Sequence, residues 1–352
     1  MSRRKVGSAD LPTSGHRLFP PLFFLRKLPT FDFRLPTFLP LILATALLAG
    51  AENRLPGTRL LANDHLTVQV MDPDAPDRYN RGVRFTPVAA VLRAELGGRD
   101  YLFSPAQHDP IADHGGLAAE FDLCIPGGPT EDLPPGWKEA EVGGGFLKIG
   151  VGVLAKERQP YHLFRNPKAL ALATTTVTWE PAAARFHQQC PGVDGYAYEL
   201  WAEVTLEESS IVVDWRLANT GSKPFITRQY SHNFIRLDDA DVGPDYVLSF
   251  PYDITVTGLL PEQEAGTREI RFVRTIPRWV NLEVPWPAGY TGENKVTLTH
   301  TGKNMAITCT TSIPGIRTAV HARAPYCSPE QFVALPLAPS AEMRWQRSYR
   351  LR

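Results

Sequence analysis

The chain has 352 residues, of which 43% are hydrophobic and 21% charged, with 32 prolines and 27 glycines. This composition is typical of a globular protein rich in turns. The formal net charge is zero, but seven of the 37 basic residues and two of the 37 acidic residues lie in residues 1–51, which leaves 30 basic and 35 acidic residues in 52–352. A mildly acidic body argues against nucleic acid or an anionic membrane as the partner.

The amino-terminal segment has the pattern of a secretory signal peptide. A basic start is followed by an apolar run at 38–48 and by small residues at 49–51. The run is about half the length that spans a bilayer, and the small residues suit cleavage after residue 51. We therefore expect residues 1–51 to be removed, and 52–352 to form a single periplasmic or secreted domain without a membrane anchor. Two alternatives stay open: an uncleaved anchor, and a true start codon downstream of Met1.

Short runs in which apolar and polar residues alternate dominate the chain from Leu66 onward, separated by Gly, Pro, Asn and Asp. These patterns predict β-strands and turns, with hairpins at 96–99, 207–210 and 301–304. The stretches with the clearest strand pattern are 66–72, 89–103, 170–180, 196–221, 246–258, 294–311 and 342–351. Because no long amphipathic helix accompanies them, they predict an all-β protein built as a large antiparallel β-sandwich.

Residues 108–146 interrupt this pattern, because they are polar and broken by Gly and Pro. They predict a long loop without strands. Their aromatic, histidine and acidic content favours an ordered loop that covers a site over a disordered one.

Four cysteines follow the predicted signal peptide. Their number permits disulfides in an oxidising compartment, although an ordinary core also holds four thiols. They are Cys124, Cys190, Cys309 and Cys327. No C-x-x-C motif is present, and the spacing of His108 and His114 fits no zinc pattern, so we expect no metal. No G-x-S-x-G, G-x-G-x-x-G or P-loop motif is present either, and we expect no cofactor.

The stretch "TRQYSHNFIRL", residues 227–237, reads as a strand with polar residues among its apolar ones. His232 titrates near physiological pH, so in a sheet that lines a cleft it suits a proton donor. The alternative is a core histidine satisfied by one hydrogen bond. Glu330 is expected in a turn before a short apolar strand, and on its own a glutamate after a proline is more often an ordinary turn residue.

Several stretches resemble the galactose mutarotase-like (aldose 1-epimerase) superfamily. "LANTGSKPFITRQYSHNFI" (217–235) is similar to the strand pair in which an N-T-G turn precedes the catalytic histidine. "YCSPEQFVALPLAPSAEMRWQRSYRL" (326–351) follows the family's order of a glutamate on a loop, an apolar strand, a turn and a last strand. "RGVRF", "HDPI" with a later "EF", and "GGGFLKIGVGVL" (143–154) resemble a bacterial branch of these proteins. The resemblance covers about residues 65–351.

The resemblance implies a mutarotase that interconverts the anomers of a monosaccharide by acid/base ring opening, with a small-molecule carbohydrate as its partner and no cofactor. It implies Glu330 as the base that deprotonates the anomeric hydroxyl and His232 as the acid that protonates the ring oxygen. Arg84 and His114 are the nearest matches for the residues that bind sugar hydroxyls, with Arg81 and His108 as rivals. Further candidate substrate-binding residues are Asp109, Glu120, Tyr230 and Asn233. An acidic residue that the resemblance implies between His232 and Glu330 stays unassigned.

Two other functions stay open at this stage. A noncatalytic carbohydrate-binding sandwich would stack aromatic residues on a sugar, although such residues also suit core packing. The candidates are Trp137, Trp201, Tyr230 and Trp286. A polysaccharide-processing enzyme on the same fold would need an open groove with a tyrosine or lysine base. Only the epimerase requires His232 and Glu330 to converge in a pocket for one sugar ring.

Overall fold

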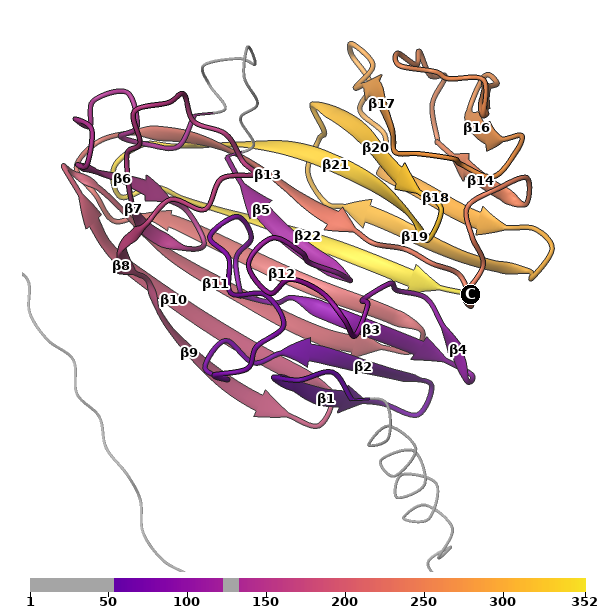
Figure 1. Ribbon diagram of the computed structural model, residues 1–352, viewed down its shortest axis with the longest axis horizontal. Helices are drawn as coiled ribbons and strands as arrows, with labels where there is room; N and C mark the ends of the chain where they lie inside the picture. Colours follow the sequence, from indigo (N-terminus) through magenta and orange to yellow (C-terminus); the bar gives the residue numbers. More distant parts are fainter. Residues whose placement is uncertain (1–53, 123–132) are drawn as a thin grey trace, which may run out of the picture. The chain divides into compact units, whose positions relative to one another are not determined.

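The computed structural model describes residues 54–122 and 133–352, which contain strands, turns and loops but no helix (Figure 1). The strands pair antiparallel in three sheets, as the sequence predicts for an all-β sandwich. The predicted signal peptide and Cys124 lie outside the described residues. Within those residues, no helix is long and apolar enough to cross a membrane.

The first sheet holds nine strands and carries the candidate site. Its order is β1-β2-β3-β5-β13-β21-β20-β17, and β4 pairs with β3 at one side. In that order the strands are β1 (Thr58–Ala62), β2 (Leu66–Met71), β3 (Val91–Leu96), β5 (Leu117–Phe121), β13 (Phe225–Asn233), β21 (Tyr326–Leu337), β20 (Arg317–Arg323) and β17 (Val280–Pro285), with β4 at Arg99–Asp100.

The second sheet holds ten strands, and a third, smaller sheet has the order β6-β7-β8. In spatial order the ten strands are β15 (Gln263–Ala265), β16 (Glu269–Phe272), β14 (Tyr246–Ser249), β18 (Asn294–His300), β19 (Met305–Thr311), β22 (Glu342–Leu351), β12 (Ser210–Asn219), β11 (Tyr196–Glu207), β10 (Ala183–Val193) and β9 (Thr174–Glu180). The three strands of the small sheet are β6 (Gly145–Lys148), β7 (Gly152–Ala155) and β8 (Ala169–Leu172).

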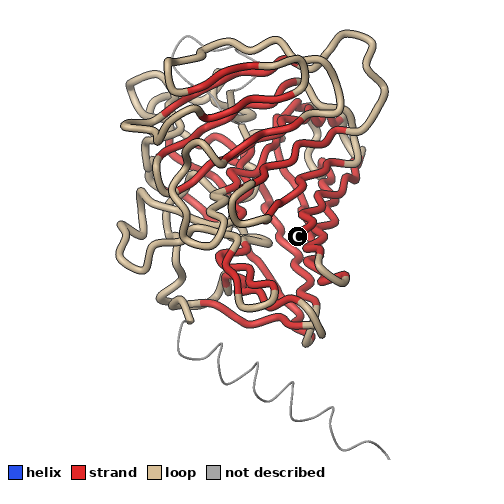
Figure 2. The backbone as a smooth tube through the Cα atoms, turned by 90° about the vertical axis from the view of Figure 1, so that its right-hand side faces the viewer, coloured by secondary structure: helices blue, strands red, loops and turns tan. Residues whose placement is uncertain are grey.

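The two large sheets pack face to face, and the main hydrophobic core lies between them. Phe121 of β5 packs edge-on against Trp215 of β12 and Trp345 of β22, each with its ring centre 6.4 Å away. Buried Arg347 of β22 donates to Gln229 Oε1 of β13 at 2.7 Å. Figure 2 shows strands through the body of the protein and loops at their ends.

The three predicted hairpin turns are confirmed. They join β3 to β4, β11 to β12, and β18 to β19. Gly97 and Gly98 both have positive φ, 60° and 75°, as a two-residue hairpin loop requires. In these strands every second side chain is buried, because the pleat turns successive residues to opposite faces; β11 shows this over most of its length.

The expectation of a strand-free loop at 108–146 is wrong. Residues 117–121 form β5, a central strand whose five residues are all buried, and β6 begins at Gly145. Such a short strand, buried on both faces, lacks the alternation that marks a half-buried strand. Gly116 precedes it with a φ of 62°, where an added Cβ would lie 2.0 Å from the carbonyl oxygen of Val91. The close approach of β3 explains the glycine at this position.

Three cysteines are described, and each is a buried free thiol. They are Cys190, Cys309 and Cys327. No group of three or more His, Cys, Asp or Glu in residues 54–122 and 133–352 is placed to hold a metal ion.

Candidate functional site

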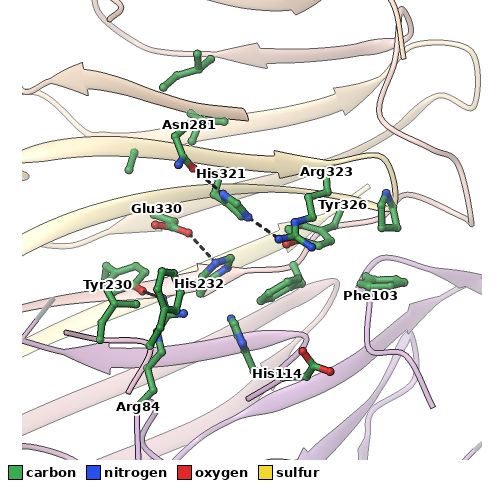
Figure 3. A pocket seen from close by; sticks show the side chains of 18 of the residues that line it. Arg84, Phe103, His114, Tyr230, His232, Asn281, His321, Arg323, Tyr326 and Glu330 are labelled. Carbon is green, nitrogen blue, oxygen red and sulfur yellow. Dashed lines mark hydrogen bonds and ion pairs between the residues drawn. The ribbon is translucent and has the colours of Figure 1, made fainter. Parts of the chain in front are cut away.

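A cleft of about 880 Å³ opens on the face of the first sheet that points away from the second sheet (Figure 3). Successive side chains of a strand point to opposite faces of the sheet, so only every second residue of each strand faces the cleft. On β13 these are Arg228, Tyr230 and His232, followed by Phe234 just after the strand, whereas the intervening Gln229 points into the sandwich and contacts Arg347.

His232 and Glu330 meet at the floor of the cleft. In the ladder between β13 and β21, Gln229 lies opposite Val333, and the bridge between Ile235 and Cys327 continues the same register. His232 therefore lies opposite Glu330, and its Nε2 atom is 3.3 Å from Glu330 Oε1. Each residue is 5% exposed. Glu330 lies within β21, and not in the turn that the sequence predicts.

Ser328 connects the two residues from beneath. Its Oγ atom accepts a hydrogen bond from the backbone N–H of Asn233 at 2.8 Å. It also lies 3.0 Å from His232 Nδ1 and donates to Glu330 Oε1 at 3.0 Å. Because the single hydroxyl proton goes to Glu330, Nδ1 is the donor in its contact with the serine oxygen. Nδ1 is thus occupied by Ser328, and Nε2 is the ring nitrogen that faces Glu330.

Burial suppresses the charge on both members of the pair. It raises the pKa of Glu330 from 4.5 to about 8, against the hydrogen bond from Ser328, which lowers it. Burial also lowers the pKa of His232 well below 6.5, and the nearby His114 and Arg84 lower it further. Near neutral pH these shifts favour a glutamic acid beside a neutral imidazole. A raised carboxyl pKa next to a lowered imidazole pKa is typical of groups that exchange protons.

Arg84 lies at one end of the cleft, held by a buried network. Its Nε lies 2.8 Å from Glu120 Oε2, and its Nη2 donates to the Tyr230 hydroxyl oxygen at 3.0 Å. Tyr230 donates in turn to Glu120 Oε2 at 2.5 Å. Lys148 Nζ lies 3.8 Å from the other oxygen of Glu120, and both residues are fully buried. Glu120 thus balances two cations beneath the cleft.

Aromatic rings complete this end. The guanidinium of Arg84 lies between Phe85 and Phe164, 4.6 and 4.8 Å from their ring centres. Phe164 is 73% exposed, and its ring forms an apolar rim that a ligand can contact. His114 packs on Phe85, with its ring centre 4.7 Å from that of His232. Its buried Nε2 atom has no hydrogen-bond partner, so it is available to a ligand.

The opposite wall of the cleft comes from β17, β20 and β21, and sequence reasoning missed it. Asn281, His321 and Tyr326 form a hydrogen-bonded line there (Figure 3). Arg317 pairs with Glu283 on the same wall at 2.5 Å. Four of these residues lie at outward positions of the alternating strands β17 and β20, where solvent-exposed polar residues give the same sequence pattern: Asn281, Glu283, Arg317 and His321. Tyr326 begins β21, whose first residues show no alternation.

Five of the predicted site residues line the cleft together. They are Arg84, His114, Tyr230, His232 and Glu330. Glu120 lies one layer beneath them, against Arg84 and Tyr230.

Three predicted site residues do not line the cleft. Asn233 is buried and donates to the carbonyl oxygen of Pro329 at 2.6 Å. His108 stacks on Tyr79, and Asp109 accepts from the backbone N–H of Ile111 within its own loop. The candidate stacking residues Trp137, Trp201 and Trp286, and the rival Arg81, also lie outside the lining.

Comparisons with solved structures show that the chain shares the fold of proteins described as galactose mutarotase or aldose epimerase related. A galactose mutarotase related enzyme from Lactobacillus acidophilus superimposes with a TM-score of 0.51 at 10% identity, over 84% of this chain and 97% of that one. A GalM/aldose epimerase homologue from C. elegans gives 0.52 at 11%, over 84% and 98%. A Synechocystis protein gives 0.53 at 12%, over 85% and 96%. No protein-family model and no curated protein sequence matches the chain.

Proposed function

We propose that this protein, which has the galactose mutarotase-like fold, is an aldose 1-epimerase that interconverts the anomers of a free sugar. The single observation that carries the proposal is the contact between His232 and Glu330 at the floor of a cleft, 3.3 Å apart. An acid and a base in contact, with pKa values moved in opposite directions, are what ring opening requires. A noncatalytic sugar-binding protein has no need of such a pair.

In the proposed reaction, Glu330 as carboxylate removes the proton from the anomeric hydroxyl. The bond between the anomeric carbon and the ring oxygen breaks, and the ring oxygen takes a proton from Nε2 of His232. The product is an open-chain aldehyde, which rotates about the bond next to its carbonyl. Closure reverses both transfers: Glu330 returns its proton to the former carbonyl oxygen, and His232 recovers the proton from the ring hydroxyl. Each transfer is worth roughly a hundredfold or more in rate.

The reactive form has the proton on His232 and the charge on Glu330, whereas burial favours the opposite arrangement. A bound sugar would shift this balance in two ways. A hydroxyl that donates to Glu330 stabilises the carboxylate, and a ring oxygen that accepts from His232 stabilises the protonated imidazole. The contact of 3.3 Å gives the proton a direct route from Oε1 to Nε2.

The remaining cleft residues would bind and orient the sugar. The unpartnered Nε2 of His114 and the guanidinium of Arg84 offer polar contacts to hydroxyl groups. Phe164 offers an apolar surface for a ring face. Glu283 lies between His232 and Glu330 in the sequence, lines the cleft, and is our candidate for the acidic residue that the sequence resemblance left unassigned.

Mutarotation of freshly dissolved aldohexoses and aldopentoses, followed by polarimetry or NMR, tests the proposal. We expect His232→Ala and Glu330→Gln each to abolish acceleration, while circular dichroism shows an unchanged fold. Retained turnover in either variant would refute the role given to that residue.

A further inference from the structure

We propose that Asn281, His321 and Tyr326 form a specificity element that presents the Tyr326 oxygen as a hydrogen-bond acceptor to one sugar hydroxyl away from the anomeric carbon. This inference rests on the proposed function and deepens it, because it names a feature that the substrate must carry. The substrate class is an aldose with a free hydroxyl at this position.

The register of three neighbouring strands brings the element together. Asn281 of β17 lies directly opposite His321 of β20. His321 in turn lies opposite Ser328 of β21, the residue beneath the proton-exchanging pair. Tyr326 begins β21, just after the turn from β20. The element therefore lies on the same face of the sheet as His232 and Glu330 (Figure 3).

The hydrogen bonds of the element have a defined direction. His321 Nδ1 lies 2.6 Å from Asn281 Oδ1, which is an acceptor only, so Nδ1 carries a proton. Burial, Arg323 and Arg84 lower the pKa of His321 to about 4, which keeps the ring neutral near pH 7 and leaves Nε2 without a proton. Nε2 lies 3.1 Å from the Tyr326 hydroxyl and accepts its proton. Burial raises the pKa of Tyr326 to about 12, so the phenol stays protonated as a donor.

Because the Tyr326 hydroxyl donates its one proton to His321, its oxygen can only accept a hydrogen bond from a ligand. The oxygen matches a donor such as a sugar hydroxyl. A sugar that lacks this hydroxyl would leave the Tyr326 oxygen without a donor. A sugar with an anionic group there would place one acceptor against another. A site built to bind a hydroxyl rejects analogues that lack it, since a buried polar group then stays unpaired.

Packing holds the tyrosine ring in place beside the reacting groups. Its centre lies 4.2 Å from that of Phe234 and 5.7 Å from that of Phe103. The ring centre of His232 is 6.4 Å away. Tyr326 therefore reaches a part of the sugar next to the reacting centre, and its hydroxyl is committed to His321, outside the proton exchange between His232 and Glu330.

The experiment measures kcat/KM for mutarotation of the best aldose and of its single-deoxy analogues, one for each non-anomeric hydroxyl. We expect the wild-type protein to disfavour one analogue by about five- to tenfold, the usual contribution of one neutral hydrogen bond. Tyr326→Phe should lower kcat/KM for the parent sugar to that of this analogue, and so abolish the discrimination. Tyr290→Phe removes a hydroxyl outside the cleft lining and serves as the matched control.

A uniform fall in kcat/KM for the parent sugar and all its analogues in Tyr326→Phe would overturn the inference and leave the proposed function standing. Absence of mutarotation in the wild-type protein with every aldose would overturn both.

A second readout does not depend on activity. The ¹⁵N chemical shifts of the His321 ring should show a proton on Nδ1 in the wild-type protein, and a loss of this preference in Asn281→Leu. A proton on Nε2 in the wild-type protein would overturn the inference.

Discussion

The Nε2 atom of His232 lies 3.3 Å from the Oε1 atom of Glu330, although the two residues come from strands far apart in the chain. Strand β13 meets β21 in the middle of the first sheet, and their register sets the two side chains opposite each other. Ser328 fixes the pair from below and the wall formed by β17 and β20 flanks it. The pairing of two sheet strands is therefore sufficient to assemble the proposed acid and base.

Ser328→Ala should move the pH dependence of kcat/KM to higher pH. Burial raises the pKa of Glu330 to about 8, and the Ser328 hydrogen bond opposes that effect by stabilising the carboxylate. Without the hydroxyl, the carboxyl pKa rises further, so the His232–Glu330 pair keeps the one proton that the reaction needs up to a higher pH. The measurement is the pH profile of mutarotation, with Ser312→Ala, outside the cleft lining, as the control. A loss of activity by one factor at every pH would show that Ser328 acts only through packing.

Glu330→Gln should stabilise the fold increasingly as the pH rises. The carboxyl pKa is 4.5 in the unfolded reference and about 8 in the folded protein, so the folded state holds the proton more tightly. The tighter binding of this proton stabilises the folded wild-type protein fully below pH 4.5. This stabilisation, on the order of a few kcal/mol, is lost as the pH rises through 8. Glu330→Gln has no carboxyl group at this position and so loses no stability in this way.

Thermal denaturation of both proteins from pH 5 to pH 9 measures this effect. The melting temperature of Glu330→Gln, relative to the wild type, should increase across this range. A constant difference would mean that Glu330 titrates in the folded protein near its ordinary value.

Glu120→Gln should destabilise the protein by about 3–5 kcal/mol, the usual cost of removing one partner of a buried ion pair. The carboxylate is fully buried and contacts Arg84 at 2.8 Å, with Lys148 at 3.8 Å. Its removal leaves both cations with less compensation. Chemical denaturation gives the free energy of unfolding.

Glu342→Gln is the matched control for this prediction. Its carboxylate pairs with Arg216 at 2.7 Å, but both side chains are 38% exposed. An exposed pair contributes little to stability, because solvent screens the two charges. If Glu120→Gln and Glu342→Gln lose the same free energy of unfolding, the Glu120 network does not stabilise the fold.

The fold was predictable where alternation is regular. Strands such as β11 and β12 bury every second residue over much of their length, and Glu208 in the turn between them has a positive φ of 50°. β5 was missed because all five of its residues are buried, so its short apolar run carries no period of two.

The site was predictable only in part. His232 and Glu330 follow from their resemblance to a known family, and the structure brings them together. Asn281, His321 and Ser328 gave no signal, because a polar residue at an outward strand position reads as solvated until the neighbouring strand is known. These three residues lie side by side on three adjacent strands, and a single sequence does not specify which strands are adjacent.

The most direct test of the central claim is the rate of mutarotation of freshly dissolved aldoses, with the wild-type protein and Glu330→Gln measured side by side. We expect the wild type to accelerate the mutarotation of at least one aldose over buffer, and Glu330→Gln not to do so. Equal rates for buffer and wild type with every aldose would contradict it, and would favour a carbohydrate-binding or polysaccharide-processing protein on the same fold.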